Sequence, residues 1–259
     1  MTARRKQQTR VHSEREIRCI RTAARTTATV LSRVAQAVRP GVSTDAIDAH
    51  ATQLIEETGG SCAFHNYRGF PGHICISVND VVVHGIGRSD CIIQPGDLVS
   101  LDVGVRLNGC VGDTALTICA GVPNATGARL MEATQKGLSA GIDAARPGQF
   151  VNDIGRAVEK AVLPYGFQIV RAFVGHGCGC ELHEPPEVPN FKCNDRGPRL
   201  QPGMVLAVEP MVNAGTADIQ VDDDGWTART ADRSLSAHFE HMILITNDKP
   251  EILTWRKTA

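Results

Sequence analysis

An internal repeat constrains the fold of this chain more than any other feature. Arg39-Pro40-Gly41 recurs as Arg146-Pro147-Gly148, and Gln94-Pro95-Gly96 recurs as Gln201-Pro202-Gly203. Both tripeptides return after 107 residues, which indicates a duplicated helix–helix–strand–strand unit. We expect the two copies to share one core, with no domain boundary near residue 125. The predicted architecture is therefore one α+β domain over residues 13–259, preceded by a flexible basic tail at residues 1–12.

Helix signals open each copy. Ser13-Glu14-Arg15-Glu16 is a capping box, which predicts a helix that ends before Pro40-Gly41. Ser43 or Thr44 can cap a second helix, which runs to about Glu57 before Gly59-Gly60. In the second copy, a helix is predicted from about Val151 to Val162. An apolar stripe at helical spacing supports the first of these helices: Ile17, Ile20, Ala24, Val30, Leu31 and Val34.

Strand signals follow the helices of the first copy. The segment from Ile74 to Val83 is rich in β-branched residues and is interrupted by the turn signal Asn79-Asp80. The segment from Leu98 to Val105 is also strand-like. Asn108-Gly109 predicts a two-residue hairpin turn, with Cys110–Cys119 as the returning strand.

Two carboxylates occupy equivalent positions in the two copies. Asp102 lies eight residues past Gln94, and Glu209 lies eight residues past Gln201. Each has apolar neighbours in a predicted strand, where a carboxylate is costly to bury unless it is paired or binds a metal. If the copies pack about a pseudo-two-fold axis, both side chains point toward one common partner.

Three further residues complete a candidate metal site. A two-residue turn places residue 104 opposite 113, so Asp113 is a diagonal neighbour of Asp102. Glu240 is the expected counterpart of Asp113 in the second hairpin, and His176 lies in a glycine-rich loop. Such a hard, oxygen-rich set suits Mn²⁺, Fe²⁺, Co²⁺ or a dinuclear Zn²⁺ centre, which would activate a bridging water and polarise a carbonyl. Taken singly, Asp113 could cap a turn, Glu240 could be solvated and His176 could be a satisfied loop histidine.

His84 and His183 are candidates for proton transfer. His84 ends an apolar strand, and His183 lies seven residues past His176. Neither has a counterpart among the duplicated carboxylates, so we place both beside a substrate carbonyl; the alternative is a buried, hydrogen-bonded histidine. The acidic run Asp222-Asp223-Asp224-Gly225 is expected to be an exposed turn.

Cysteine content and charge limit the classes of protein to which this chain can belong. The nine cysteines form no CxxC pair, so we expect free thiols. Cys178 and Cys180 suggest zinc, but no second Cys/His cluster completes a four-ligand site.

The formal charge of −1 indicates no general attraction to nucleic acid or membranes, and no signal peptide or membrane span is apparent. We expect a cytoplasmic protein. The basic residues Arg4, Arg5, Lys6 and Arg10 fit a frayed tail or a segment that docks on an anionic partner such as the ribosome.

Taken in order, these residues resemble the type I methionine aminopeptidases, which have the pita-bread metallopeptidase fold. The resemblance covers about residues 13–250. The stretches that carry it are Ile76–Asp80 through His84-Gly85, Leu101–Val103 through Gly112–Thr114, Gly175–Gly177, Gly203-Met204 through Glu209–Gly215, and Asp232–Ala237 through Glu240-His241.

The resemblance implies a function and a set of site residues. The expected reaction is hydrolytic removal of the first methionine from nascent chains and peptides whose second residue is small, by a monomer. Glu209 would be the general base, and His84 and His183 would contact the substrate. Two divalent metal ions (Co, Mn, Fe, Zn or Ni) would be held by Asp102, Asp113, His176, Glu209 and Glu240; the methionine pocket would include Tyr67, Phe70, Cys75 and Trp226; and a monovalent cation would bind at Asn79, Val81 and Ser236.

The chain departs from that pattern at two positions. Gly104 stands where the family often has Thr, and Leu182 stands where an aromatic residue is common, so a hydrogen bond near Asp102 and part of the pocket wall are expected to change. No zinc-finger segment precedes the first helix, and no type II insertion follows His183. A proline-directed peptidase with an added N-terminal domain and a non-catalytic protein on the same fold are the rival interpretations.

Overall fold

The computed structural model describes residues 9–255. Its long helices are α1 (Glu14–Ala37), α2 (Thr44–Glu57), α3 (Ala125–Ala144) and α4 (Val151–Val162), with short 3₁₀ turns η1 (Tyr67–Gly69) and η2 (Leu163–Tyr165). The strands are β1 (Ser61–Cys62), β2 (Cys75–Val78), β3 (Val81–Val83), β4 (Leu98–Leu107), β5 (Cys110–Cys119), β6 (Gln168–Ile169), β7 (Gly175–Gly177), β8 (Glu184–Val188), β9 (Val205–Val208), β10 (Met211–Asn213), β11 (Ile219–Val221), β12 (Ala228–Thr230), β13 (Ser236–His238), β14 (His241–Leu244) and β15 (Glu251–Ile252).

The helices begin where the sequence predicts, although one cap differs. At α1, the Ser13 hydroxyl accepts from the Glu16 backbone N–H, and the Glu16 carboxylate accepts from the Ser13 N–H at 2.8 Å. At α2, Ser43 is the N-cap residue, but its side chain makes no capping bond. Thr44 instead exchanges hydrogen bonds with the backbone of Arg88, which fixes the helix to a loop. Within residues 9–255, no helix is both long and apolar enough to cross a membrane.

The β4–β5 hairpin has the predicted register. Asn108 and Gly109 form its two-residue turn with φ values of 53° and 80°, and Gly104 lies opposite Asp113. Asp102 faces Ala115, so Asp102 and Asp113 are diagonal neighbours, as expected. This hairpin pairs with β1 and β2 in the sheet of the first copy.

The strands of the second copy contact β5 of the first copy through hydrogen bonds. There β9 pairs with β14 and β10 with β13, with a break between the two pairs. At this break, the backbone N–H of Glu240 donates to the carbonyl of Ala115 in β5 at 3.0 Å. Thr117 in β5 both donates to and accepts from the backbone of His238. Hydrogen bonds across the pseudo-two-fold axis thus join the two copies.

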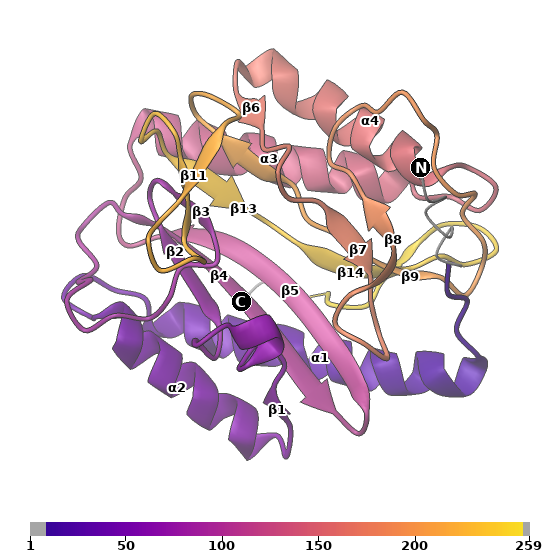
Figure 1. Ribbon diagram of the computed structural model, residues 1–259, viewed down its shortest axis with the longest axis horizontal. Coiled ribbons are helices and arrows are strands. Elements are labelled where there is room, and N and C mark those ends of the chain that lie inside the picture. Colours follow the sequence, from indigo (N-terminus) through magenta and orange to yellow (C-terminus); the bar gives the residue numbers. More distant parts are fainter. Residues whose placement is uncertain (1–8, 256–259) are drawn as a thin grey trace.

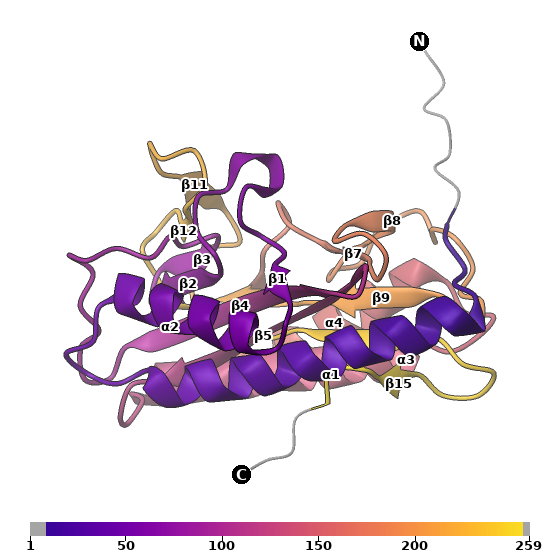
Figure 2. The same ribbon diagram turned by 90° about the horizontal axis from the view of Figure 1, so that it is seen from below.

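Helices cover one side of the strands. Figure 1 shows α1 and α2 beside the strands of the first copy, and α3 and α4 beside those of the second. In Figure 2, α1 lies on one side of the strands, and β3, β11 and β12 project on the other. Leu116 of β5 packs against the apolar clusters of both copies, so the two cores meet at this strand.

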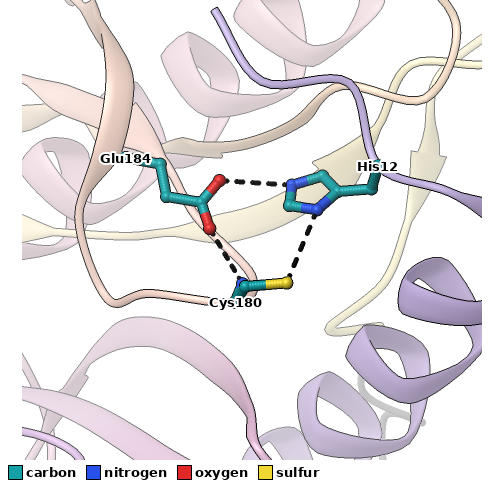
Figure 3. A group of neighbouring side chains, drawn as sticks. All are labelled: His12, Cys180 and Glu184. Carbon is teal, nitrogen blue, oxygen red and sulfur yellow. Dashed lines mark hydrogen bonds and ion pairs between the residues drawn. The ribbon is translucent and has the colours of Figure 1, made fainter.

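The N-terminal segment is packed from residue 10 onward. Of the tail predicted to be flexible, residues 1–8, including Arg4, Arg5 and Lys6, lie outside the described residues. Arg10 forms ion pairs with Glu16 and Glu184. His12, which Figure 3 shows beside Cys180 and Glu184, is 5% exposed. The last residues of this segment are thus in contact with the domain through a buried imidazole.

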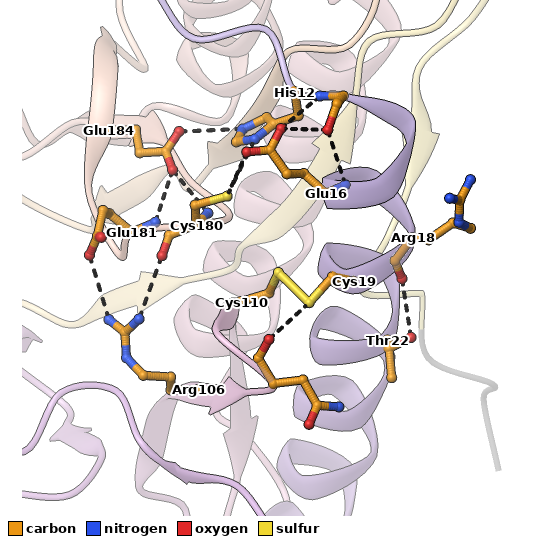
Figure 4. Close-up of a disulfide and its surroundings, with 12 residues drawn as sticks. His12, Glu16, Arg18, Cys19, Thr22, Arg106, Cys110, Cys180, Glu181 and Glu184 are labelled. Carbon is orange, nitrogen blue, oxygen red and sulfur yellow. Dashed lines mark hydrogen bonds and ion pairs between the residues drawn. A yellow bond between two sulfur atoms is a disulfide. The ribbon is translucent and has the colours of Figure 1, made fainter.

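A disulfide joins α1 to the end of the β4–β5 hairpin. Cys19 and Cys110 are bonded, with their Cα atoms 6.0 Å apart (Figure 4). The prediction of free thiols is wrong for this pair and holds for the other seven cysteines. The sequence spacing could not reveal the bond, because only the packing of α1 along β5 brings these residues together.

Close packing of α1 on β5 predicts an effect on stability. A Cβ at Gly112 would lie 2.2 Å from Thr27 Oγ1 and 2.6 Å from the Ala23 carbonyl oxygen. Gly112→Ala should therefore lower the free energy of unfolding by about 1–3 kcal/mol, the usual cost of overpacking. Gly127→Ala in α3 is the matched control, because its Cβ would meet no atom closer than 3.4 Å. Urea unfolding of both variants tests this; equal stabilities would refute the proposed contact.

Candidate metal centre and substrate pocket

Strands of both copies bring the five predicted ligands together around one cavity. Asp102 lies in β4, Asp113 in β5 and His176 in β7, while Glu209 follows β9 and Glu240 precedes β14. His176 Nε2 lies 3.3 Å from Glu209 Oε1 and 3.8 Å from Asp113 Oδ2. Asp113, His176 and Glu240 each offer a donor atom, and these atoms lie within 4.8 Å of one another.

The imidazole of His176 is held with one nitrogen free to bind a metal. Its Nδ1 lies 2.9 Å from the Gly177 carbonyl oxygen, to which it donates as the protonated nitrogen. That tautomer leaves Nε2 as the lone-pair nitrogen facing the carboxylates. The glycine-rich segment was expected to be a loop, but it is the short strand β7, paired with β8 and β9.

Burial shifts the protonation equilibria of the centre. It raises the pKa of Asp102 to about 7. It also raises the pKa values of Asp113 and Glu209 well above their ordinary range, with the Asp102 charge adding to the effect. Burial lowers the pKa of His176 to about 4. The site therefore disfavours ionised carboxylates and a protonated imidazole. A bound cation would stabilise the carboxylates in their charged form and would bind the neutral imidazole.

The donor set fits a divalent metal. Asp102 Oδ1 and Asp113 Oδ1 are buried and find no hydrogen-bond partner among the described residues. A buried oxygen without a donor costs free energy, and metal coordination would remove that cost. Carboxylates with one imidazole are ligands suited to first-row divalent ions.

His84 and His183 lie beside the carboxylates. The ring of His84 packs edge-on against Phe173, and burial lowers its pKa. His84 has a φ of 61°, a backbone conformation uncommon for this residue type. His183 lies on the ring of His176, with centroids 4.1 Å apart, and its Nδ1 is 3.0 Å from the Tyr67 hydroxyl.

A narrow apolar cavity adjoins these groups. Its volume is about 90 Å³, less than the ~150 Å³ of an engineered cavity that holds benzene, so it suits one slim side chain. It is lined by the four expected pocket residues Tyr67, Phe70, Cys75 and Trp226, by the metal-centre residues, by His84 and His183, and by Phe64 and Leu182.

Phe64 was missed by the sequence analysis, and it explains a departure noted there. A Cβ at Gly104 would lie 2.5 Å from Phe64 Cε1. The phenyl ring thus fills the space that a larger residue at 104 would need. Leu182 is 1% exposed and packs in the same apolar cluster as Phe64 and Phe70, so the pocket wall is closed at this position.

His238 is a second residue that the sequence analysis missed. It is 2% exposed, and its Nε2 lies 3.7 Å from Glu209 Oε2. Burial lowers its pKa to about 3, so the ring is neutral near neutral pH. No repeat or turn signal marks this residue; only its position next to Phe239-Glu240 in a buried strand could have drawn attention.

The predicted cation ligands and the acidic run do not line the cavity. The backbone N–H of Ser236 donates to the Asn79 carbonyl at 2.8 Å, and Val81 begins the adjacent β3. The acidic run forms a turn after β11, as expected. Its Asp224 carboxylate accepts from the backbone N–H of Trp226 at 2.8 Å, which helps to fix that pocket residue.

Comparisons with known proteins agree with this arrangement. The metallopeptidase family M24 matches residues 18–247. A methionine aminopeptidase of Aquifex aeolicus is 42% identical over 252 residues, which cover 94% of this chain and 98% of that protein. The crystal structure of methionine aminopeptidase from Rickettsia prowazekii has a TM-score of 0.93 at 37% identity, covering 96% of this chain and 100% of the other.

A prolidase from Pyrococcus furiosus shares the fold alone. Its TM-score is 0.75 at 21% identity, and the match covers 96% of this chain but 66% of the prolidase. Prolidases and methionine aminopeptidases both have the pita-bread fold, so the expected fold class is confirmed. Because the family match spans most of the sequence, the chain belongs to metallopeptidase family M24.

Proposed function

We propose that this protein removes the N-terminal methionine from peptides and nascent proteins whose second residue is small. One observation carries the proposal: buried carboxylates and His176 line the same narrow apolar cavity as Phe70 and Cys75. A peptide whose first side chain enters that cavity would place its first peptide bond beside the carboxylates. The relatives that match over nearly their whole length are named methionine aminopeptidases.

The five candidate ligands would hold two divalent metal ions. Asp113 lies 3.8 Å from His176 Nε2 and diagonally beside Asp102, so it would help to hold the metal together with both residues. When bound, such ions polarise a carbonyl and lower the pKa of water. Methionine release by the metal-free protein, after addition of Co, Mn, Fe, Zn or Ni in turn, would identify the metal that supports activity.

The protein's own residues would orient the substrate and move protons. Glu209 would take the proton of the attacking water, because its Oε1 lies 3.3 Å from His176 Nε2 and its carboxylate lines the cavity. His84 and His183 would hydrogen-bond the reacting peptide, since both line the cavity beside the carboxylates. Tyr67 would hold His183 in position through the 3.0 Å contact between hydroxyl and Nδ1.

The cavity would select methionine by shape. A thioether side chain is unbranched and polarizable, and it makes favourable contacts with aromatic rings. Phe70 and Trp226 pack edge-on with centroids 5.3 Å apart and offer such rings. The residue after methionine would lie near His84, where the crowded rings leave room for a small side chain.

Further parts of the proposal rest on the surrounding structure. The carbonyl groups near Asn79, Val81 and Ser236 would bind one monovalent cation beside β3. Residues 13–259 would form one catalytic domain, because Leu116 packs against both apolar clusters. The protein would act as a monomer on nascent chains in the cytoplasm.

The function is tested by methionine release from short peptides. After chelation, the protein should release no methionine from a Met-Ala peptide, and addition of Mn²⁺, Fe²⁺ or Co²⁺ should restore release. A Met-Trp peptide should be cleaved far more slowly than the Met-Ala peptide. Full activity of the metal-free protein, verified by elemental analysis, or equal rates on the two peptides would contradict the proposal.

Removal of the Asp113 carboxylate should affect both metal content and rate. The Asp113→Ala variant lacks the carboxylate beside Asp102 and His176, so at least one metal should bind more weakly. Turnover should fall by two orders of magnitude or more, on the scale of about 10²–10⁴ for a catalytic group. Metal stoichiometry and turnover are measured on the same preparation. A variant with wild-type values of both would show that the ligand assignment is wrong.

The two types of histidine should separate in the same assays. His84→Ala should lose about 10²–10⁴-fold in rate while it keeps its metal content, because its ring contacts the peptide. His176→Ala should lose metal affinity as well as rate, because Nε2 faces the carboxylates. Metal titration and turnover of both purified variants test this; the reverse pattern would mean that the two roles are exchanged.

A further inference from the structure

A second group of metal-ligating side chains lies outside the substrate cavity. His12, Cys180 and Glu184 each present a donor atom, and the three atoms lie within 4.8 Å of one another (Figure 3). None of the three lines the cavity that contains His176. The group joins the segment before α1 to the loop between β7 and β8, two parts of the chain that are far apart in sequence.

The imidazole of His12 lies between the thiol and the carboxylate. Its Nδ1 is 3.8 Å from Cys180 Sγ, and its Nε2 is 3.3 Å from Glu184 Oε2. His12 is 5% exposed and Glu184 is 7% exposed. Neither His12 Nε2 nor Glu184 Oε2 makes a well-formed hydrogen bond within residues 9–255. Two nearly buried side chains thus face each other through incompletely satisfied polar atoms, and the second ring nitrogen of His12 faces the thiol.

The backbone holds the carboxylate of Glu184 in this orientation. Its Oε1 accepts from the backbone N–H groups of Cys180 and Glu181, both at 2.9 Å. These two bonds fix the carboxylate plane and leave Oε2 directed toward His12. The arrangement is therefore preorganised on the side of the loop, as a metal site requires.

From this geometry we propose that His12, Cys180 and Glu184 bind a zinc ion distinct from the metals of the catalytic centre. Thiolate, imidazole and carboxylate are the three ligand types that Zn²⁺ takes in proteins. In a tetrahedral zinc site with bonds of about 2.0–2.3 Å, the ligand atoms lie roughly 3.3–3.7 Å apart. This separation is close to the distance between His12 Nδ1 and Cys180 Sγ. Glu16 lies beside this group, with its Oε1 3.6 Å from Cys180 Sγ (Figure 4).

Charge balance favours a divalent ion at this position. Arg10 lies 2.8 Å from Glu16 Oε1 and 3.5 Å from Glu184 Oε1. The two positive charges of zinc and the one of Arg10 would balance the Cys180 thiolate and the two carboxylates. Without metal, the thiol keeps its proton, because burial raises its pKa to about 11. Binding would replace the S–H bond by a Zn–S bond and release that proton to solvent.

Such a site corrects the sequence-based argument against zinc. The sequence contains no second Cys/His cluster that would complete a four-ligand zinc site with Cys178 and Cys180. Cys178 remains apart, with its Sγ 3.9 Å from Met242 Sδ in the core. The missing ligand is His12, which was assigned to the tail. A metal here would fasten this segment to the loop that carries Leu182 and His183, and so to one wall of the substrate cavity.

Cobalt substitution tests the proposal, because only a thiolate ligand gives an intense sulfur-to-cobalt charge-transfer band. The metal-stripped full chain is titrated with Co²⁺, and the near-ultraviolet band is recorded together with bound metal and methionine release. The expected result is a band that saturates at one ion per chain. In Cys180→Ser the band should vanish and bound metal should fall by one equivalent, with methionine release unchanged when the catalytic centre is saturated.

Cys193→Ser is the matched control, since Cys193 is also a partly exposed free thiol, and it should keep the band. In His12→Ala, the affinity for the ion that gives the band should fall by tenfold or more. If Cys180→Ser does not fold, X-ray absorption of the zinc-loaded wild-type protein replaces it and should show a sulfur neighbour at about 2.3 Å. Absence of that neighbour, or a band that persists in Cys180→Ser, would overturn the proposal and leave His12 and Glu184 as an ion pair only. Methionine release is read separately, so this outcome is distinguishable from failure of the proposed function.

Discussion

Mutual burial of like charges is the constraint on which the rest of this structure depends. Asp102, Asp113, Glu209 and Glu240 would repel one another if ionised without a counter-ion, and burial already disfavours the charged forms of the first three. Only a rigid framework can hold them together in the absence of metal. The fold provides it by placing each carboxylate on or next to a strand and by bonding β5 to the strands around Glu240.

Much of this framework was predictable, because the signals are local or repeated. The two-residue turn at Asn108-Gly109 fixes the register of β4 and β5, and that register determines the placement of Asp102 against Asp113. The repeat relates Asp102 to Glu209. A carboxylate within an apolar strand is unusual enough to indicate a ligand without further context. These features require only the sequence, turn chemistry and the cost of burying a charge.

Other features could not be predicted, because they depend on contacts between distant segments. Phe64 belongs to the pocket only because a loop folds over Gly104, and no periodicity marks it. His12 lies in a stretch whose composition suggested a frayed tail. The bond between Cys19 and Cys110 exists because α1 runs along β5. In each case the decisive fact is which surface of one element faces another, and single-sequence patterns do not contain it.

The hydrogen bonds that cross the pseudo-two-fold axis have a consequence for biosynthesis. Asp102 and Asp113 leave the ribosome early. Glu240, whose carbonyl accepts a hydrogen bond from the Thr114 hydroxyl, emerges only when most of the chain has been translated. The carboxylates of the first half become buried only when they pack against the second half. The first half therefore cannot reach its final packing until the second half has been synthesised. A ribosome-bound fragment would therefore have no working centre, and the chain could not process its own N-terminus during most of its synthesis.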